Sequence, residues 1–136
     1  MQIVTRTILA GTSLLVTMFL VRRFSSSSSS STFRPGILYT TESNMANAKK
    51  LARLLIQSKH AACVQLKEVT SIFEWEGKVE EEKEIQLTIK CNLAHFSTLE
   101  SFIKSKHSYD VPQIIAVDAM AISSDYLSFL TAGTTQ

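Results

Sequence analysis

The side chains that could do chemistry are few and are not spaced for catalysis. Cys63 and Cys91 could act as thiolate ligands or as a redox pair, but they form neither a metal-type spacing nor a CxxC motif. We expect both to pack as small hydrophobic side chains. The acidic run Glu80–Glu84 alternates between the two faces of an expected strand, so its carboxylates do not form an acid/base pair. Without a nucleophile–base pair, a phosphate-binding loop or a metal triad, the sequence predicts a protein that is not an enzyme.

The three histidines do not form a site by their spacing in the sequence. His60 and His95 fall near the ends of expected helices, where we expect them to face solvent or to cap those helices. His107 is the remaining imidazole, and one imidazole does not make a metal site.

The elements that must position these residues begin with a strand and a helix. Gly36–Glu42 has the β-branched and aromatic content of a short strand. Ser43 or Asn44 can then cap a helix whose apolar residues recur every three or four positions and which ends near Lys59.

A long hairpin is expected next, from Ala61–Trp75 to Val79–Cys91. The apolar positions of the first strand change from even to odd numbers midway, so we expect a bulge at Lys67-Glu68. The second strand keeps odd apolar positions, which predicts a three-residue loop, Glu76-Gly77-Lys78. This register places the two cysteines on opposite faces of the hairpin, so we expect no disulfide between them.

The second half of the domain is expected to supply a helix, a strand and a terminal helix. Asn92 can cap a helix that ends near Lys106, and Gln113–Met120 has the near-continuous apolar character of a strand buried by its neighbours. Ser123-Ser124-Asp125 then precedes a short last helix, Tyr126–Thr131. The order βαββαβ with a terminal helix predicts an α+β fold of the ferredoxin-like type.

Several segments, in their order along the chain, resemble the CutA family of divalent-cation-tolerance proteins. They read AACV, TSIFEWEGKVEEEKE, IK and HSYDVPQI, and the resemblance runs from about Gly36 to Leu130. It implies a homotrimer in which the long hairpins and edge strands of neighbouring subunits pair, which would remove exposed strand edges. It also implies a role in the response to metal ions, with copper binding, for a non-catalytic scaffold or small-ligand sensor.

Two other functions stay open. Vertebrate-type relatives are linked to acetylcholinesterase, which suggests an interaction protein that helps to anchor or process such a partner in membranes. Analogy of fold alone suggests a small-molecule regulator like the trimeric PII-type signalling proteins.

The resemblance gives no metal ligands that carry over to this chain. Bacterial relatives supply Cys, His and Glu at positions that here read Tyr39, Lys106 and Gln113. A phenol, an ammonium and a neutral amide are poor ligands for copper, so copper(II) as a cofactor is an expectation from the family that these replacements weaken.

The resemblance also implies a pocket between subunits. The family pattern places Lys90, His107 and Tyr109 there, and Tyr39 and Trp75 are expected to border it. A cation, an imidazole and a phenol could hold a small anion. The alternative is structural, with Tyr109 tying down its loop and Lys90 paired with a carboxylate.

Charge divides the chain into a leader, residues 1–34, and a domain, residues 35–136. The first 41 residues hold four Arg and no Asp or Glu, whereas the rest carry 10 Lys+Arg and 12 Asp+Glu. Because the domain is not basic, we expect no nucleic-acid partner. An apolar run, Ile8–Val21, precedes Arg22-Arg23-Phe24 and a linker of seven serines. This pattern is typical of a mitochondrial transit peptide, with a secretory signal or a membrane signal-anchor as alternatives.

Overall fold

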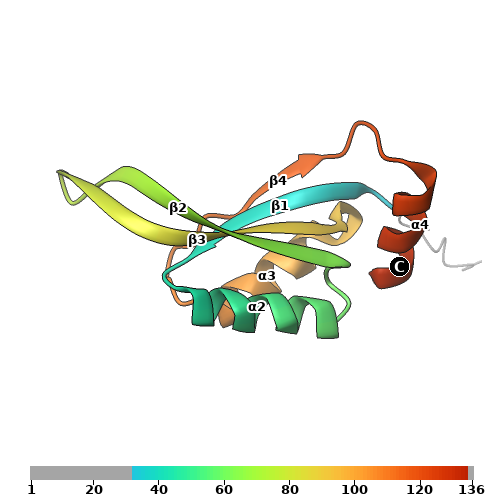
Figure 1. Ribbon diagram of the computed structural model, residues 1–136, viewed down its shortest axis with the longest axis horizontal. Coiled ribbons are helices and arrows are strands. Elements are labelled where there is room, and N and C mark those ends of the chain that lie inside the picture. The colour runs from blue at the N-terminus through green and yellow to red at the C-terminus, as the bar shows by residue number, and fades with distance from the viewer. Residues whose placement is uncertain (1–31, 135–136) are drawn as a thin grey trace, which may run out of the picture. The chain divides into compact units, whose positions relative to one another are not determined.

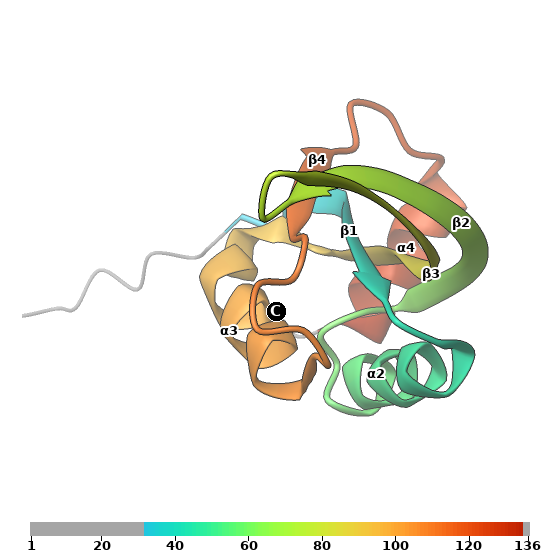
Figure 2. The ribbon, with the colours of Figure 1, turned by 90° about the vertical axis from the view of Figure 1, so that its left-hand side faces the viewer.

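The computed structural model describes residues 32–134, which form a four-stranded sheet with helices packed against it (Figure 1). Helices α2 and α3 cover one face of the sheet, and α4 lies at the end of the sheet away from the tip of the hairpin (Figure 1, Figure 2). In chain order the elements are β1 (Pro35–Glu42), α2 (Met45–Gln57), β2 (Cys63–Trp75), β3 (Lys78–Asn92), the short 3₁₀ turn η1 (Leu93–His95), α3 (Phe96–Lys106), β4 (Ile115–Asp118) and α4 (Ser124–Gly133).

The strand order across the sheet is β2-β3-β1-β4, and every neighbouring pair is antiparallel. This arrangement confirms the predicted ferredoxin-like fold, in which β2 and β4 form the two edges. The central strands β1 and β3 therefore carry the core of the sheet.

The core lies between the sheet and the α2–α3 layer. Helix α2 buries the stripe that its three- and four-residue spacing predicts, and Asn44 caps it by accepting the Asn47 N–H at 2.9 Å. The Cys91 side chain is fully buried in this core, and burial raises its pKa to about 12, so it packs as a small hydrophobic side chain as predicted. The core residues from the sheet are Leu38, Ile85, Leu87, Ile89 and Cys91, and those from the helices are Ala48, Leu51, Leu55, Leu99 and Ile103.

The hairpin corrects two predictions. Its register is unbroken from Cys63 opposite Lys90 to Trp75 opposite Lys78, so the predicted bulge at Lys67-Glu68 is absent. The loop is the two-residue turn Glu76-Gly77, with φ of 51° and 77°, rather than the predicted three-residue loop.

The change from even to odd apolar positions along β2 has a cause other than a bulge. Near Cys63 the hairpin lies over helices, so its apolar residues share the covered face. Farther out no helix of the described chain covers the arm, and apolar side chains occur on both faces, with Ile72 68% and Trp75 59% exposed. The register still puts Cys63 and Cys91 on opposite faces, because Cys63 pairs with the residue that precedes Cys91.

The fourth strand also differs from its prediction. It is only four residues long, and it forms an edge of the sheet rather than a strand buried by neighbours. Ile115 is 52% and Val117 44% exposed. The apolar run therefore marks a surface that the described chain leaves uncovered.

Arg34 joins the start of the domain to the sheet. Its N–H donates to Asn92 Oδ1 at 2.9 Å, its carbonyl accepts the Leu93 N–H at 2.7 Å, and its guanidinium pairs with Asp118 at 2.6 Å. The rest of the expected leader, up to residue 31, lies outside the described residues. Within residues 32–134 no helix is long and apolar enough to cross a bilayer.

Candidate functional site

A cluster of buried polar side chains lies where β1 ends. Alternation along β1 places Leu38, Thr40 and Glu42 on one face, and the Glu42 residue is only 1% exposed. The segment after α3 covers this carboxylate. Ser108 N–H donates to Glu42 Oε1 at 3.3 Å, and the Ser108 hydroxyl donates to Oε2. These bonds compensate the cost of burying a carboxylate.

His107 lies beside Glu42 as a neutral imidazole. Its Nδ1 accepts the N–H of Tyr109 at 3.0 Å, so the ring proton is on Nε2 and is donated to Thr40 Oγ1 at 3.1 Å. Burial lowers the pKa of His107, although Glu42, 3.8 Å from Nδ1, acts in the opposite direction. The imidazole is therefore a fixed donor and acceptor that holds the loop against β1.

Tyr109 extends the cluster to β3. Burial, together with a hydrogen bond to Glu84, raises the pKa of Tyr109 to about 12. Glu84 is 8% exposed and also accepts the Ser71 hydroxyl of β2 at 2.6 Å. The Tyr109 ring lies 5.4 Å from the His107 ring, centroid to centroid. We call this group the His107 cluster, and its members are Thr40, Glu42, Ser71, Glu84, His107, Ser108 and Tyr109.

Of the five residues predicted to form the pocket, one subunit brings together only His107 and Tyr109. Lys90 lies on the sheet face opposite the α2–α3 layer, where it donates to Gln65 Oε1 and lies 3.9 Å from Cys63 Sγ. Lys90 is therefore hydrogen-bonded to the side-chain amide of Gln65 rather than to a carboxylate. Tyr39 shares that face, because it pairs with Thr88 in the same alternation.

Trp75 lies far out on the hairpin, directly before the turn, and is exposed. The described chain therefore does not bring the five predicted residues together by itself.

The sequence-based search missed Glu42 and Glu84. A carboxylate at a core-facing position of β1 was a usable signal for Glu42, since such positions are normally apolar. Glu84 had no such signal, because it belongs to an acidic run that otherwise faces solvent. Only the tertiary contact with Tyr109 distinguishes it.

The three positions that the resemblance matches to metal ligands lie on different segments of the described chain. Tyr39 is on β1, Lys106 is the exposed last residue of α3, and Gln113 is exposed in the segment before β4. Among residues 32–134 no three His, Cys, Asp or Glu side chains are grouped so that they could hold a metal ion.

Comparison with known proteins accounts for the fold. Residues 36–133 match the family model described as CutA1 divalent ion tolerance protein. The divalent-cation tolerance protein CutA of Pyrococcus horikoshii is 37% identical over 98 residues, covering 72% of this chain and 96% of that protein. Protein CutA, chloroplastic, of Arabidopsis thaliana is 37% identical over 126 residues, covering 89% of this chain and 69% of that protein. The crystal structure of CutA1 from Oryza sativa superposes with a TM-score of 0.74 at 34% identity, covering 79% of this chain and 99% of that one. A family match over most of the chain, together with the same fold, shows that this chain belongs to the CutA1 divalent ion tolerance protein family.

Proposed function

We propose that this chain forms a homotrimer that serves divalent-cation tolerance as a non-catalytic, ligand-binding protein. The observation that carries the proposal is the pair of sheet edges, β2 and β4, each of which has a strand neighbour on one side only in the described chain. Exposed apolar side chains lie along both of them. They are Ile72, Phe73 and Trp75 on β2 and Ile115 and Val117 on β4.

The two edges are different surfaces, so they favour a head-to-tail contact between subunits. An edge of unpaired N–H and C=O groups flanked by apolar side chains is a template for another strand. A head-to-tail contact that closes on itself gives a ring. A ring of three would cover the hairpin arms and β4 at once, which explains why their apolar residues follow no single face.

The ligand site we propose forms between subunits. Lys90 and Tyr39, on the sheet face opposite the α2–α3 layer of one subunit, would meet His107 and Tyr109 of another. Because Glu42 and Glu84 are buried beside His107 and Tyr109, an anionic group of the ligand would be favoured on the Lys90 side of such a pocket.

Light scattering of the purified chain tests the assembly. The 15.1 kDa chain is expected to run at three times this mass and to keep that mass on dilution. Ile72→Asp and Ile115→Asp should each weaken the assembly, because they place a charge in a desolvated contact. Ile56→Asp, at an exposed isoleucine on α2, is the matched control and should remain trimeric. A wild-type monomer at micromolar concentration would contradict the proposal.

We further propose that the leader addresses the domain to an organelle, with the mitochondrion as the expected destination. The match to the chloroplastic Arabidopsis protein covers more of this chain than residues 36–136 alone. This extent supports an organelle address in the N-terminal part.

A further inference from the structure

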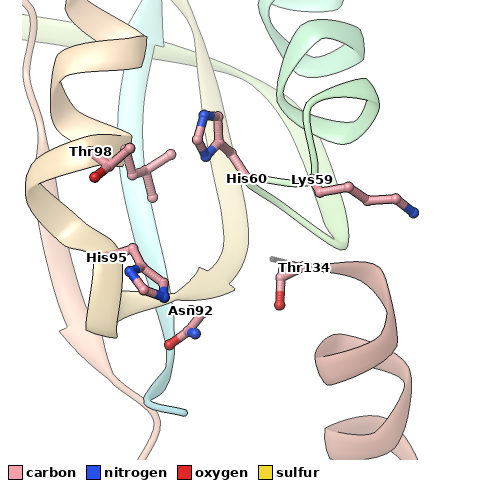
Figure 3. Close-up of a pocket in the computed structure, with 7 residues that line it drawn as sticks. Lys59, His60, Asn92, His95, Thr98 and Thr134 are labelled. Carbon is pink, nitrogen blue, oxygen red and sulfur yellow. The ribbon is translucent and has the colours of Figure 1, made fainter. Parts of the chain in front are cut away.

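A polar pocket lies at the opposite end of α3 from the His107 cluster. Helix α3 separates the two by 11 residues, or about 16 Å at about 1.5 Å per residue. The cavity has a volume of about 130 Å³, and it lies where the ends of α2 and α4 meet the start of α3 (Figure 3). Its polar lining residues are Lys59, His60, Asn92, His95, Thr98 and Thr134.

The turn that follows α2 places His60 at this cavity. Lys59 takes a left-handed conformation, φ 61°, which turns the chain so that the His60 N–H bonds back to the Leu55 carbonyl at 3.0 Å. The His60 ring then packs on Phe102 of α3, with ring centroids 4.4 Å apart. Burial lowers the pKa of His60, and a neutral imidazole still offers one N–H donor. His60 is therefore part of the pocket rather than the exposed or capping residue that its position suggested.

Asn92 turns donors toward the cavity. Its residue is 5% exposed, and its Oδ1 accepts both the Arg34 N–H at 2.9 Å and the Ala94 N–H at 3.0 Å. Because the oxygen is held by these two bonds, the orientation of the amide is fixed and its NH₂ group faces the other way. Figure 3 shows the nitrogen on the side of Thr134.

The composition of the lining favours an anionic ligand. It includes two imidazoles, an amide donor and two hydroxyls, and no acidic side chain. The Lys59 side chain points away from both imidazoles, so its ammonium would act on a bound anion only at longer range (Figure 3). A transition metal would need further soft or charged ligands, which this lining does not contain.

We propose that this pocket binds a small oxyanion, of the phosphate or carboxylate class, through His60, His95 and the Asn92 amide. The volume suffices, since one water needs only about 10–15 Å³ on the same measure. The site is a binding function separate from the His107 cluster.

Titration of the full chain with inorganic phosphate, followed by NMR of the imidazole nitrogens, tests the proposal. The His60 and His95 signals should shift and saturate by about 10 mM phosphate, ten times a millimolar Kd. Any shift of the His107 signals should follow a separate affinity that Asn92→Asp leaves unchanged, because His107 lies at the other end of α3. A parallel titration with acetate distinguishes carboxylates from phosphates.

Asn92→Asp is the decisive variant. It keeps an oxygen that accepts the Arg34 and Ala94 N–H groups, so the fold should persist, but it replaces the donor with a negative charge. Phosphate affinity should fall by about tenfold or more. Lys59→Gln should weaken binding by severalfold, whereas Lys104→Gln, at an exposed lysine of α3, should leave it unchanged.

Three results would overturn the proposal. The first is the absence of imidazole shifts with both phosphate and acetate. The second is an equal phosphate affinity of wild type and Asn92→Asp. The third is saturable binding of copper(II) at His60 and His95 that tightens in Asn92→Asp, which would make the pocket a metal site.

Discussion

At the level of single residues, the His107 cluster stabilises a loop by burying groups that normally prefer water. Glu42 and Glu84 lie under polar partners drawn from β2 and the segment after α3. Such a cluster is favourable only while every member keeps its partner. In residues 32–134 no fully buried side-chain nitrogen or oxygen lacks a hydrogen bond, which satisfies this condition.

The lowered pKa of His107 predicts the pH dependence of stability. Below pH of about 6.5 the unfolded chain takes up a proton on this histidine that the folded protein resists. The free energy of unfolding should therefore fall as the pH decreases from about 7.5 to 5.5. In urea titrations His107→Gln should reduce this pH dependence, and His60→Gln should reduce it separately, because burial lowers the pKa of His60 too. His95→Gln is the comparison. A wild-type stability that rose toward pH 5.5 would contradict the assignment of His107 as neutral.

The replaced ligand positions predict weak copper binding. The triple variant Tyr39→Cys, Lys106→His and Gln113→Glu restores a thiolate, an imidazole and a carboxylate at the positions that match the ligands of bacterial relatives. Calorimetry should show tighter copper(II) binding to this variant than to wild type. Tight wild-type binding that the substitutions leave unchanged would mean that copper binds elsewhere on the protein.

At the level of elements, the hairpin turn is less than optimal for its geometry. A two-residue turn with both φ values positive suits Asn-Gly, whereas Glu76 adopts φ 51° at a steric cost. Lys59 makes the same compromise at the end of α2.

Glu76→Asn should stabilise the arm by about 0.5–1 kcal/mol, because asparagine tolerates the left-handed conformation. Amide hydrogen exchange at Trp75 and Lys78, which flank the turn, should slow. Glu74→Asn, within β2, removes the same charge without a positive φ and should give no gain. Equal exchange rates in the two variants would show that φ at position 76 carries no cost.

Elements were predictable from the sequence where one chain determines the burial pattern. The α2 stripe and the β1–β3 core follow from periodicity, because both sides of each contact are present in the subunit. The bulge and the buried β4 were wrong because apolar residues on the arm and on β4 are not covered within it. His107 and Tyr109 are two residues apart and could be paired from the sequence, whereas Ser108 meets Glu42 across 66 residues, a contact that only the fold creates.

At the level of the whole molecule, charge divides the chain near residue 41. All 12 acidic residues follow position 41, while the leader is basic. A fusion of residues 1–34 to a fluorescent reporter should enter mitochondria and be cut near Phe24. Arg22→Ala with Arg23→Ala should impair both steps.

Two other outcomes of this experiment have distinct meanings. Glycosylation of an engineered Asn-x-Thr site downstream of the leader would show the secretory route instead. Import into plastids rather than mitochondria would match the location in the name of the Arabidopsis relative.

The backbone of Arg34 is bonded to the domain, which would limit how far a peptidase that removes the proposed leader could trim the chain. Its ion pair with Asp118 is exposed and adds little, but its peptide group supplies the donor for Asn92 and the acceptor for Leu93. A peptidase that stopped before Arg34 would leave the sheet unchanged. One that removed Arg34 would leave the Leu93 N–H without its acceptor and loosen the amide of Asn92. Any removal of the proposed leader would therefore meet a structural limit at Arg34, which the folded domain itself provides.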